Sequence, residues 1–197
     1  MSIMSKTDRD TIIRIVSNAF EQNPRAVAMM KKKNPARNVR LMTEYAYELV
    51  EKFNGIYLSE DKTTVLFYYR ESEYRRSLID YLKYGIMFLR AIRPSQLLPT
   101  LKREKYIKSL RPDIDDYIYV WVLGSDPNTT SIRGLADIRD HLFGLSEKLD
   151  LPILIETTVE KVLKLYKYVG FKQYREWYDE EAALKVWFLQ RGLKEPA

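Results

Sequence analysis

The sequence predicts an α/β protein with a mixed central sheet flanked by helices. Apolar residues recur at helical spacing through much of the first half, where a β-hairpin pattern interrupts them. From residue 117 onward, strand and helix patterns alternate before two adjacent strand patterns close the chain. Strands joined through helices pair in parallel and strands joined by short turns pair antiparallel, so a mixed sheet is expected. The 197 residues show no internal repeat or long linker, so a single domain that spans residues 1–197 is expected.

The first half is expected to be mostly helical. A short helical piece carrying Val27 and Met30 follows the turn signal at Pro24. Pro94 is expected to end the third long helix, and the fourth is expected to be interrupted or to begin again near Pro99. The long helices are predicted over residues 8–21, 37–53, 74–93 and 95–110, and the hairpin strands over 56–58 and 64–69.

The last third has the most regular pattern. A strand at 119–123 runs into a turn at 124–127. Gly170 is expected to end the last helix in a left-handed conformation. The remaining elements are helices over 134–149 and 159–168 and strands over 153–156, 171–178 and 183–190.

The composition narrows the chemistry that the chain can carry. A hydrophobic content of 46% indicates a folded core. The absence of cysteine excludes disulfides, zinc–thiolate sites and thiol nucleophiles. His141 is the single histidine, so we expect neither a histidine-rich metal site nor a Ser-His-Asp triad, and we assign no metal ligand. A surface or half-buried helix position is expected for His141.

Charge and hydropathy point to a cytoplasmic protein with an anionic partner. No apolar run reaches the ~18 residues of a membrane span, and the N-terminus lacks a signal pattern, so no membrane partner is expected. The net charge of +6 fits coenzyme A, an acidic substrate or nucleic acid. Acidic residues interrupt the basic runs, which argues against a nucleic-acid surface.

Three segments of the last third follow a familiar order. A strand and turn cover 119–127, a second strand ends at Glu156, and the next helix carries Tyr166 four residues before Gly170-Phe171. This order resembles the GNAT superfamily of acyl-CoA-dependent N-acetyltransferases. The resemblance implies a GNAT-like fold whose parallel strands, near residues 119–124 and 152–156, splay apart.

The resemblance also implies an activity. Residues 117–191 would form the acyl-CoA side of the domain, and the N-terminal half would form the acceptor side. The protein would transfer acetyl from acetyl-CoA to an amine, small-molecule or peptide, by direct attack. The alternative is a non-catalytic GNAT-fold protein that serves as a binding or interaction module. A homodimer is also possible, formed either through sheet edges or through the helical insert that follows the β-hairpin.

GNAT relatives wrap the CoA pyrophosphate with a loop of the form Arg/Gln-x-x-Gly-x-Gly/Ala at a helix N-terminus, where backbone N–H groups favour anions. With one inserted residue, 131–136 fits this pattern with Ser131 in place of Arg/Gln. Without the insertion, Thr130, Arg133 and Leu135 take the signature positions and both glycines are lost. Both alignments stay open. The cofactor contacts implied by the resemblance are Leu123, Ser125, Ser131, Ile132, Arg133, Gly134, Leu135, Ala136 and Thr157.

Tyr166 is the candidate catalytic residue. The corresponding tyrosine of GNAT relatives can donate a proton to the departing CoA thiolate. The alternative is an aromatic packing residue on an amphipathic helix. Val159 and Val162 stand where relatives often carry an asparagine that contacts the cofactor arm, a departure that counts against activity.

The proton acceptor for the amine is left unassigned. A carboxylate, or a water that it holds, is the usual choice. Asp115, Asp116 and Glu156 lie near the relevant strand ends, and all three are interpreted as turn or surface carboxylates.

Overall fold

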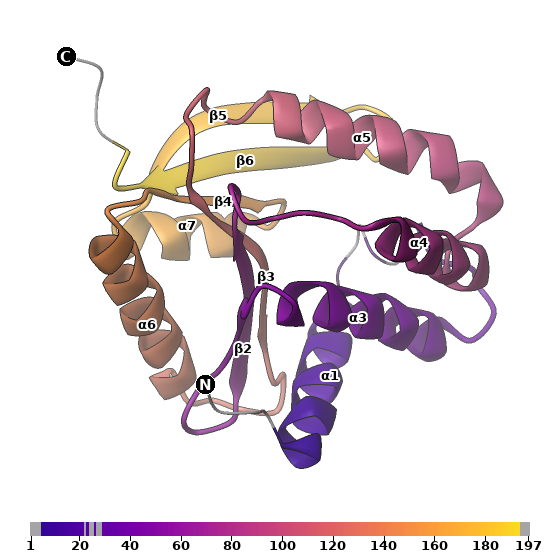
Figure 1. Cartoon of the computed structure of the whole chain (residues 1–197), viewed down its shortest axis with the longest axis horizontal. Helices are drawn as coiled ribbons and strands as arrows, with labels where there is room; N and C mark the ends of the chain where they lie inside the picture. The colour runs from indigo at the N-terminus through magenta and orange to yellow at the C-terminus, as the bar shows by residue number, and fades with distance from the viewer. Residues whose placement is uncertain (1–4, 22, 24–25, 27–28, 194–197) are drawn as a thin grey trace.

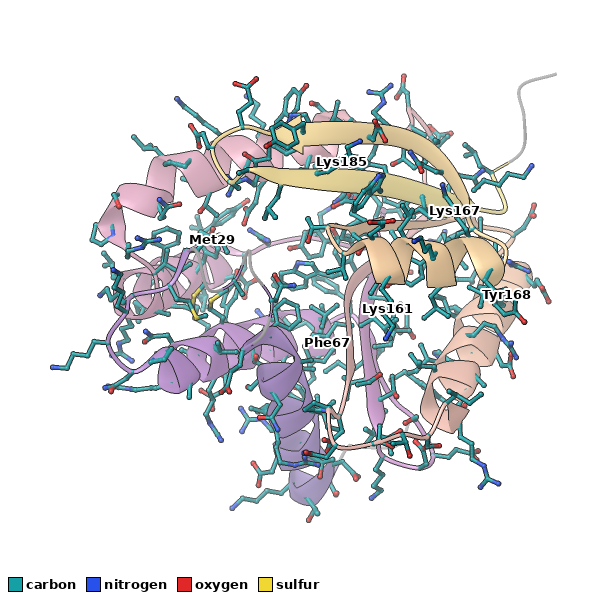
Figure 2. All side chains as sticks on the ribbon, turned by 180° about the vertical axis from the view of Figure 1, so that it is seen from behind. Met29, Phe67, Lys161, Lys167, Tyr168 and Lys185 are labelled. Carbon is teal, nitrogen blue, oxygen red and sulfur yellow. The ribbon has the colours of Figure 1, made fainter. Side chains whose placement is uncertain are left out.

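The computed structural model describes residues 5–21, 23, 26 and 29–193; Pro24 and Val27, in the predicted turn and short helical piece, lie outside the described residues. The described chain forms a six-stranded mixed sheet with helices on both faces, as predicted (Figure 1). The strand order is β1-β2-β3-β4-β6-β5, in which only β3 and β4 pair in parallel. The strands are β1 (Ile56–Leu58), β2 (Thr64–Arg70), β3 (Ile118–Ser125), β4 (Ile153–Thr157), β5 (Lys172–Asp179) and β6 (Leu184–Arg191).

Two groups of helices cover the two faces of the sheet (Figure 1). One face carries α1 and α3, whose buried side chains pack against Val65, Phe67 and Val122. The other face carries α6 and α7, which pack against Ile118 and Ile153. The helices are α1 (Lys6–Glu21), α3 (Pro35–Glu51), α4 (Leu78–Ala91), α5 (Leu97–Ser109), α6 (Arg133–Leu149) and α7 (Glu160–Tyr168), with a 3₁₀ turn at Pro94–Gln96.

The insert between β2 and β3 differs from its prediction at two points. Helix α4 begins at Leu78, not near residue 74, because Ser77 and Asp80 form a capping box that fixes the first turn. Helix α5 runs through Pro99 without interruption. Pro99 lies in the first turn of α5, where a backbone N–H has no partner within the helix, so the missing donor costs nothing there.

A buried ion pair holds α5 on the β5–β6 hairpin. Arg103 of α5 donates to Asp179 at the end of β5, and both side chains are only 6% exposed. Ile107 packs beside this pair against Val186 and Phe188 of β6. The insert is therefore anchored at its C-terminal helix, across the sheet from α7 (Figure 1).

The junction between α7 and β5 has the predicted conformation. Gly170 has a φ of +100°, the left-handed value that glycine adopts without strain. The backbone N–H of Phe171 donates to the carbonyl of Tyr166, which closes a Schellman motif. The Gly-Phe pair is thus explained by chain geometry alone.

Candidate functional site

The parallel strands β3 and β4 separate beyond three paired residues. The ladder joins Ile118–Val120 to Ile153–Ile155. Beyond it β3 continues beside β2 to Ser125, while Glu156 and Thr157 of β4 pair with β6. The two strands therefore diverge, and backbone groups of both face the gap. This is the splay predicted near residues 119–124 and 152–156.

A β-bulge on β3 lies at the point where the strands separate. Tyr68 of β2 pairs with Val120 and Phe67 pairs with Val122, so Trp121 is the extra residue on β3. The half-buried side chain of Trp121 packs against clusters that include residues of α1, α3 and α4, and against a third cluster formed by Tyr69, Tyr119 and their neighbours. Trp121 has no partner of its own on β2, so the bulge interrupts the β2–β3 ladder beside the opening.

Glu156 stands at the end of β4 within a buried polar cluster. Its carboxylate accepts hydrogen bonds from Arg111 Nε at 3.2 Å and from Tyr119 Oη at 2.9 Å. The Arg111 guanidinium also lies 3.7 Å from the centre of the Tyr119 ring. The Glu156 side chain is 12% exposed, so its interpretation as a turn or surface carboxylate is wrong. Burial keeps the pKa of Tyr119 well above its usual value, and the protonated hydroxyl can donate to Glu156.

The other two candidate carboxylates lie elsewhere. Asp116 is not a free surface group either, because it accepts hydrogen bonds from Arg70 and from the backbone and hydroxyl of Ser72. Asp115 is exposed, as expected. Of the three, Glu156 is the carboxylate that the fold brings to the end of β4 beside the diverging strands.

Tyr166 lies on the inner face of α7. Its side chain is 8% exposed and contacts Phe171, with ring centroids 5.7 Å apart. It belongs to the cluster between the sheet and helices α6 and α7, together with Leu163 and Ile155. Burial raises the pKa of Tyr166 above its usual value, so the hydroxyl keeps its proton at neutral pH.

The predicted phosphate loop leads into α6, and the β1–β2 turn packs close to the N-terminus of this helix. Asp61 Oδ1, in that turn, lies 3.0 Å from the position that a Cβ on Gly134 would take, and Ser131 Oγ accepts from the N–H of Arg133 at 3.2 Å. A Cβ on Gly134 would lie 2.4 Å from Thr63 Oγ1, so the glycine permits a close approach of the turn. Donation from the hydroxyls of Ser59 and Thr63 lowers the pKa of Asp61. A carboxylate of this chain therefore lies close to the N-terminus of α6, where the helix dipole favours an anion.

The remaining predicted contacts lie at three places: the start of α6, the end of β3 and the end of β4. Ser131, Ile132 and Arg133 are exposed at the start of α6, whereas Leu135 and Ala136 are half-buried. Leu123 and Ser125 lie on β3 beyond the bulge, and Ser125 Oγ is 3.3 Å from Thr64 Oγ1. Thr157 Oγ1 accepts the N–H of Val159 at 3.2 Å, which turns the chain into α7.

Arg111, Tyr119 and Trp121 were not predicted as site residues. The alternation of Tyr117, Tyr119 and Trp121 places these aromatic side chains on one face of the predicted strand, the only sequence signal for them. Arg111 lies in a polar segment before the strand, and its contact with Glu156 spans 45 positions, so only the folded chain reveals it.

His141 has a structural environment on α6. Its ring stacks on Tyr57 with centroids 3.7 Å apart, and its Nε2 lies 3.4 Å from the Tyr68 hydroxyl. Burial lowers the pKa of His141. The expected half-buried helix position is confirmed.

No family model matches the chain, and no curated protein matches its sequence. Solved structures match its fold. The histone acetyltransferase HPA2 and related acetyltransferase from Corynebacterium glutamicum is 14% identical, with a TM-score of 0.63, and the match covers 98% of this chain and 95% of that one. The C-terminal condensation domain of Ebony, solved with beta-alanyl-dopamine, is 6% identical, with a TM-score of 0.65 and 95% of each chain covered.

The polyamine N acetyltransferase of Drosophila melanogaster also matches the fold. It is 10% identical, with a TM-score of 0.57, and the match covers 96% of this chain and 97% of that one. Together with the splayed strands and the bulge, these likenesses define the class: the chain has the fold of the GNAT N-acetyltransferases.

Neither a membrane-spanning helix nor a cluster of metal ligands is present in the part of the chain that the structure describes. Among the helices described, none is both long and apolar enough to span a bilayer. Within the same residues, no group of three or more histidine, aspartate or glutamate side chains is arranged to hold a metal ion.

Proposed function

We propose that the protein is an N-acyltransferase that moves an acetyl group from acetyl-CoA to an amine. The observation that carries the proposal is the divergence of β3 and β4 at the Trp121 bulge, with Glu156 at its edge. Backbone groups freed from a ladder can hydrogen-bond the amide-containing arm of CoA, much as another strand would. Nearly full-length likeness in fold to acetyltransferases supports this use of the gap.

The gap between the strands suits the arm of acetyl-CoA better than the start of α6 suits its phosphates. The arm would lie along the edge of β3 near Leu123 that faces away from β2, whereas the carboxylate of Asp61 lies close to Gly134. The exposed side chains of Ser131 and Arg133 remain to contact the pyrophosphate. The bound thioester supplies an activated acyl group. With Asp61 in this position we expect weaker binding than an open helix N-terminus would give.

Two residues manage the protons of the proposed transfer. As the amine nitrogen bonds to the acyl carbon and the carbon–sulfur bond breaks, the Tyr166 hydroxyl donates a proton to the leaving sulfur. Glu156, directly or through water, accepts the proton that the amine loses. Its carboxylate already accepts from Arg111 and Tyr119 and retains lone pairs for a further donor. The acceptor is a small-molecule or peptide amine.

A turnover assay tests this proposal. Purified protein and acetyl-CoA are incubated with a panel of polyamines, arylalkylamines and lysine peptides, and free thiol is followed over time. Amine-dependent thiol release that Glu156→Gln reduces about 10²-fold supports the proposal. Asp115→Asn is the matched control, because Asp115 is exposed and should leave the rate unchanged. Thiol release from no amine, or equal rates for both variants, contradicts the assignment.

A further inference from the structure

Helix α4 presents an apolar face to solvent. Its buried side is formed by Met87, Phe88 and Ala91, which pack toward α3. The opposite side is apolar as well: Leu78 is 88% exposed, and large fractions of the other side chains are exposed too. The exposed apolar residues of α4 are Leu78, Ile79, Tyr81, Leu82, Ile86 and Leu89. A soluble protein rarely leaves such a face uncovered.

The spacing of this face specifies a helix as its partner. Leu78, Leu82, Gly85 and Leu89 recur at intervals of four, three and four residues, the a/d seam of a coiled coil. Ile79 and Ile86 flank the seam. Binding to a lipid surface does not require a narrow a/d seam. A second helix does, because its side chains insert as knobs into the holes between the seam residues.

Gly85 lies within the seam and has no role in the fold of its own chain. A Cβ added to it would meet nothing within 4 Å in the described structure. Glycine inside a helix is unfavourable relative to alanine, and its usual compensation is close approach of another group. The vacant volume therefore fits a side chain from outside.

We propose that α4 is the interface of a twofold-symmetric homodimer, in which it packs antiparallel against α4 of a second copy. In this register Leu82 fills the hollow at Gly85 of the partner, and Leu78 contacts Leu89 of the partner. Because each contact occurs twice, the face is complementary to itself, as a twofold interface requires. The 14-residue helix gives a seam of about 21 Å.

Area and charge agree with a second copy. At roughly 100 Å² for each large side chain, the six exposed residues offer on the order of 600 Å² per chain, close to the ~800 Å² per partner of a standard interface. The nearest cation on the helix, Lys83, is paired with Glu48 of α3 at 2.7 Å. Arg90 lies on the rim, and the two copies of Arg90 fall at opposite ends of an antiparallel pair. No like charges meet in the seam.

Sedimentation velocity tests the proposal. We expect the wild type to sediment as a dimer, and Leu82→Glu to weaken the dimer at least about tenfold, because a carboxylate would be buried against apolar groups. Gly85→Phe should do the same by filling the hollow, while each chain has room for the ring. Tyr168→Glu is the matched control: Tyr168 is 89% exposed on α7, and the dimer should persist. Circular dichroism establishes that each variant is folded.

Cross-linking tests the direction of the pair in a chain that lacks cysteine. The double variant Leu78→Cys with Leu89→Cys should form an intermolecular disulfide. Leu78→Cys alone should not, since its symmetry mate would lie about 16 Å away along the pair. A monomeric wild type, a dimer that survives both seam variants, or a monomer that instead binds anionic vesicles through α4 would overturn the proposal.

Discussion

Asp61 Oδ1 lies 3.0 Å from the position that a Cβ on Gly134 would take, at the N-terminus of α6. A GNAT pyrophosphate loop would use such a helix end for the phosphates of CoA, yet here a turn between two strands supplies the anion. Two hydrogen bonds to Asp137, from the Tyr57 hydroxyl and from the backbone of Glu60, hold α6 beside this turn. Under the proposed function, the carboxylate of Asp61 would compete with the phosphates of acetyl-CoA for the helix end.

Asp61→Asn is therefore expected to strengthen acetyl-CoA binding. Removal of the charge should gain about 1 kcal/mol, or roughly fivefold in Kd, because the helix end then faces no anion of the chain. Isothermal titration measures the change. Asp140→Asn, at an exposed position later in α6, is the matched control and should have no effect. Equal affinities for all three proteins would mean that the phosphates do not approach Gly134.

Tyr166→Phe is expected to lower kcat about 10²-fold with little change in KM, because only the proton donor is removed. The ring remains in contact with Phe171, so the fold should be preserved. Steady-state kinetics with the amine found by the panel measure both constants. Tyr168→Phe, on the exposed side of the same helix, should match the wild type. An unaltered kcat in Tyr166→Phe would leave Tyr166 as a packing residue.

The buried pair between Arg103 and Asp179 makes a separate prediction about stability. Asp179→Ala leaves the guanidinium buried without its carboxylate and should lower the free energy of unfolding by about 3 kcal/mol. Urea denaturation monitored by tryptophan fluorescence measures the loss. Glu160→Ala breaks the exposed pair with Lys164 and should cost less than about 1 kcal/mol. Similar losses for both variants would contradict the role given to burial.

Asp80 is expected to make stability depend on pH in the acidic range. A hydrogen bond from Lys52, then those from Ser77, lower the pKa of Asp80 to about 2 from a usual value of 3.8. Since the folded state binds the proton less tightly than the unfolded state, the stabilisation is present above pH 4 and is lost between pH 4 and pH 2. The contribution is at most about 2.5 kcal/mol. Denaturation curves for wild type and Asp80→Asn should converge as the pH falls through this interval; a constant difference would contradict the assignment.

The fold could be predicted from the sequence because its signals are local. Apolar spacing located the strands of the sheet, and the order of elements after residue 117 gave the mixed pairing. The start of α4 was missed because Ser77 and Asp80 act through a cap, which apolar spacing does not register. The spacing of hydrophobic residues also did not predict that Leu78 and Leu82 face solvent.

The candidate site was less predictable because its contacts are distant in the chain. Asp61 lies close to Gly134, and Arg111 donates to Glu156. The spacing of apolar residues along the chain predicts neither contact. Tyr166, by contrast, was proposed from its fixed distance from Gly170, and the structure confirms only that Gly170 ends the helix in a left-handed conformation. The donor and acceptor roles assigned to these residues remain predictions.

Titration of acetyl-CoA into the purified protein, with Arg133→Glu as the paired variant, tests the central claim most directly. The account predicts saturable binding that the charge reversal weakens at least about fivefold, because Arg133 is exposed at the start of α6 and would contact phosphate. The variant should be as stable as the wild type. Absence of both heat and thermal shift at millimolar acetyl-CoA, for the wild type and for Asp61→Asn alike, would contradict the acyltransferase and favour a non-catalytic interaction module with this fold.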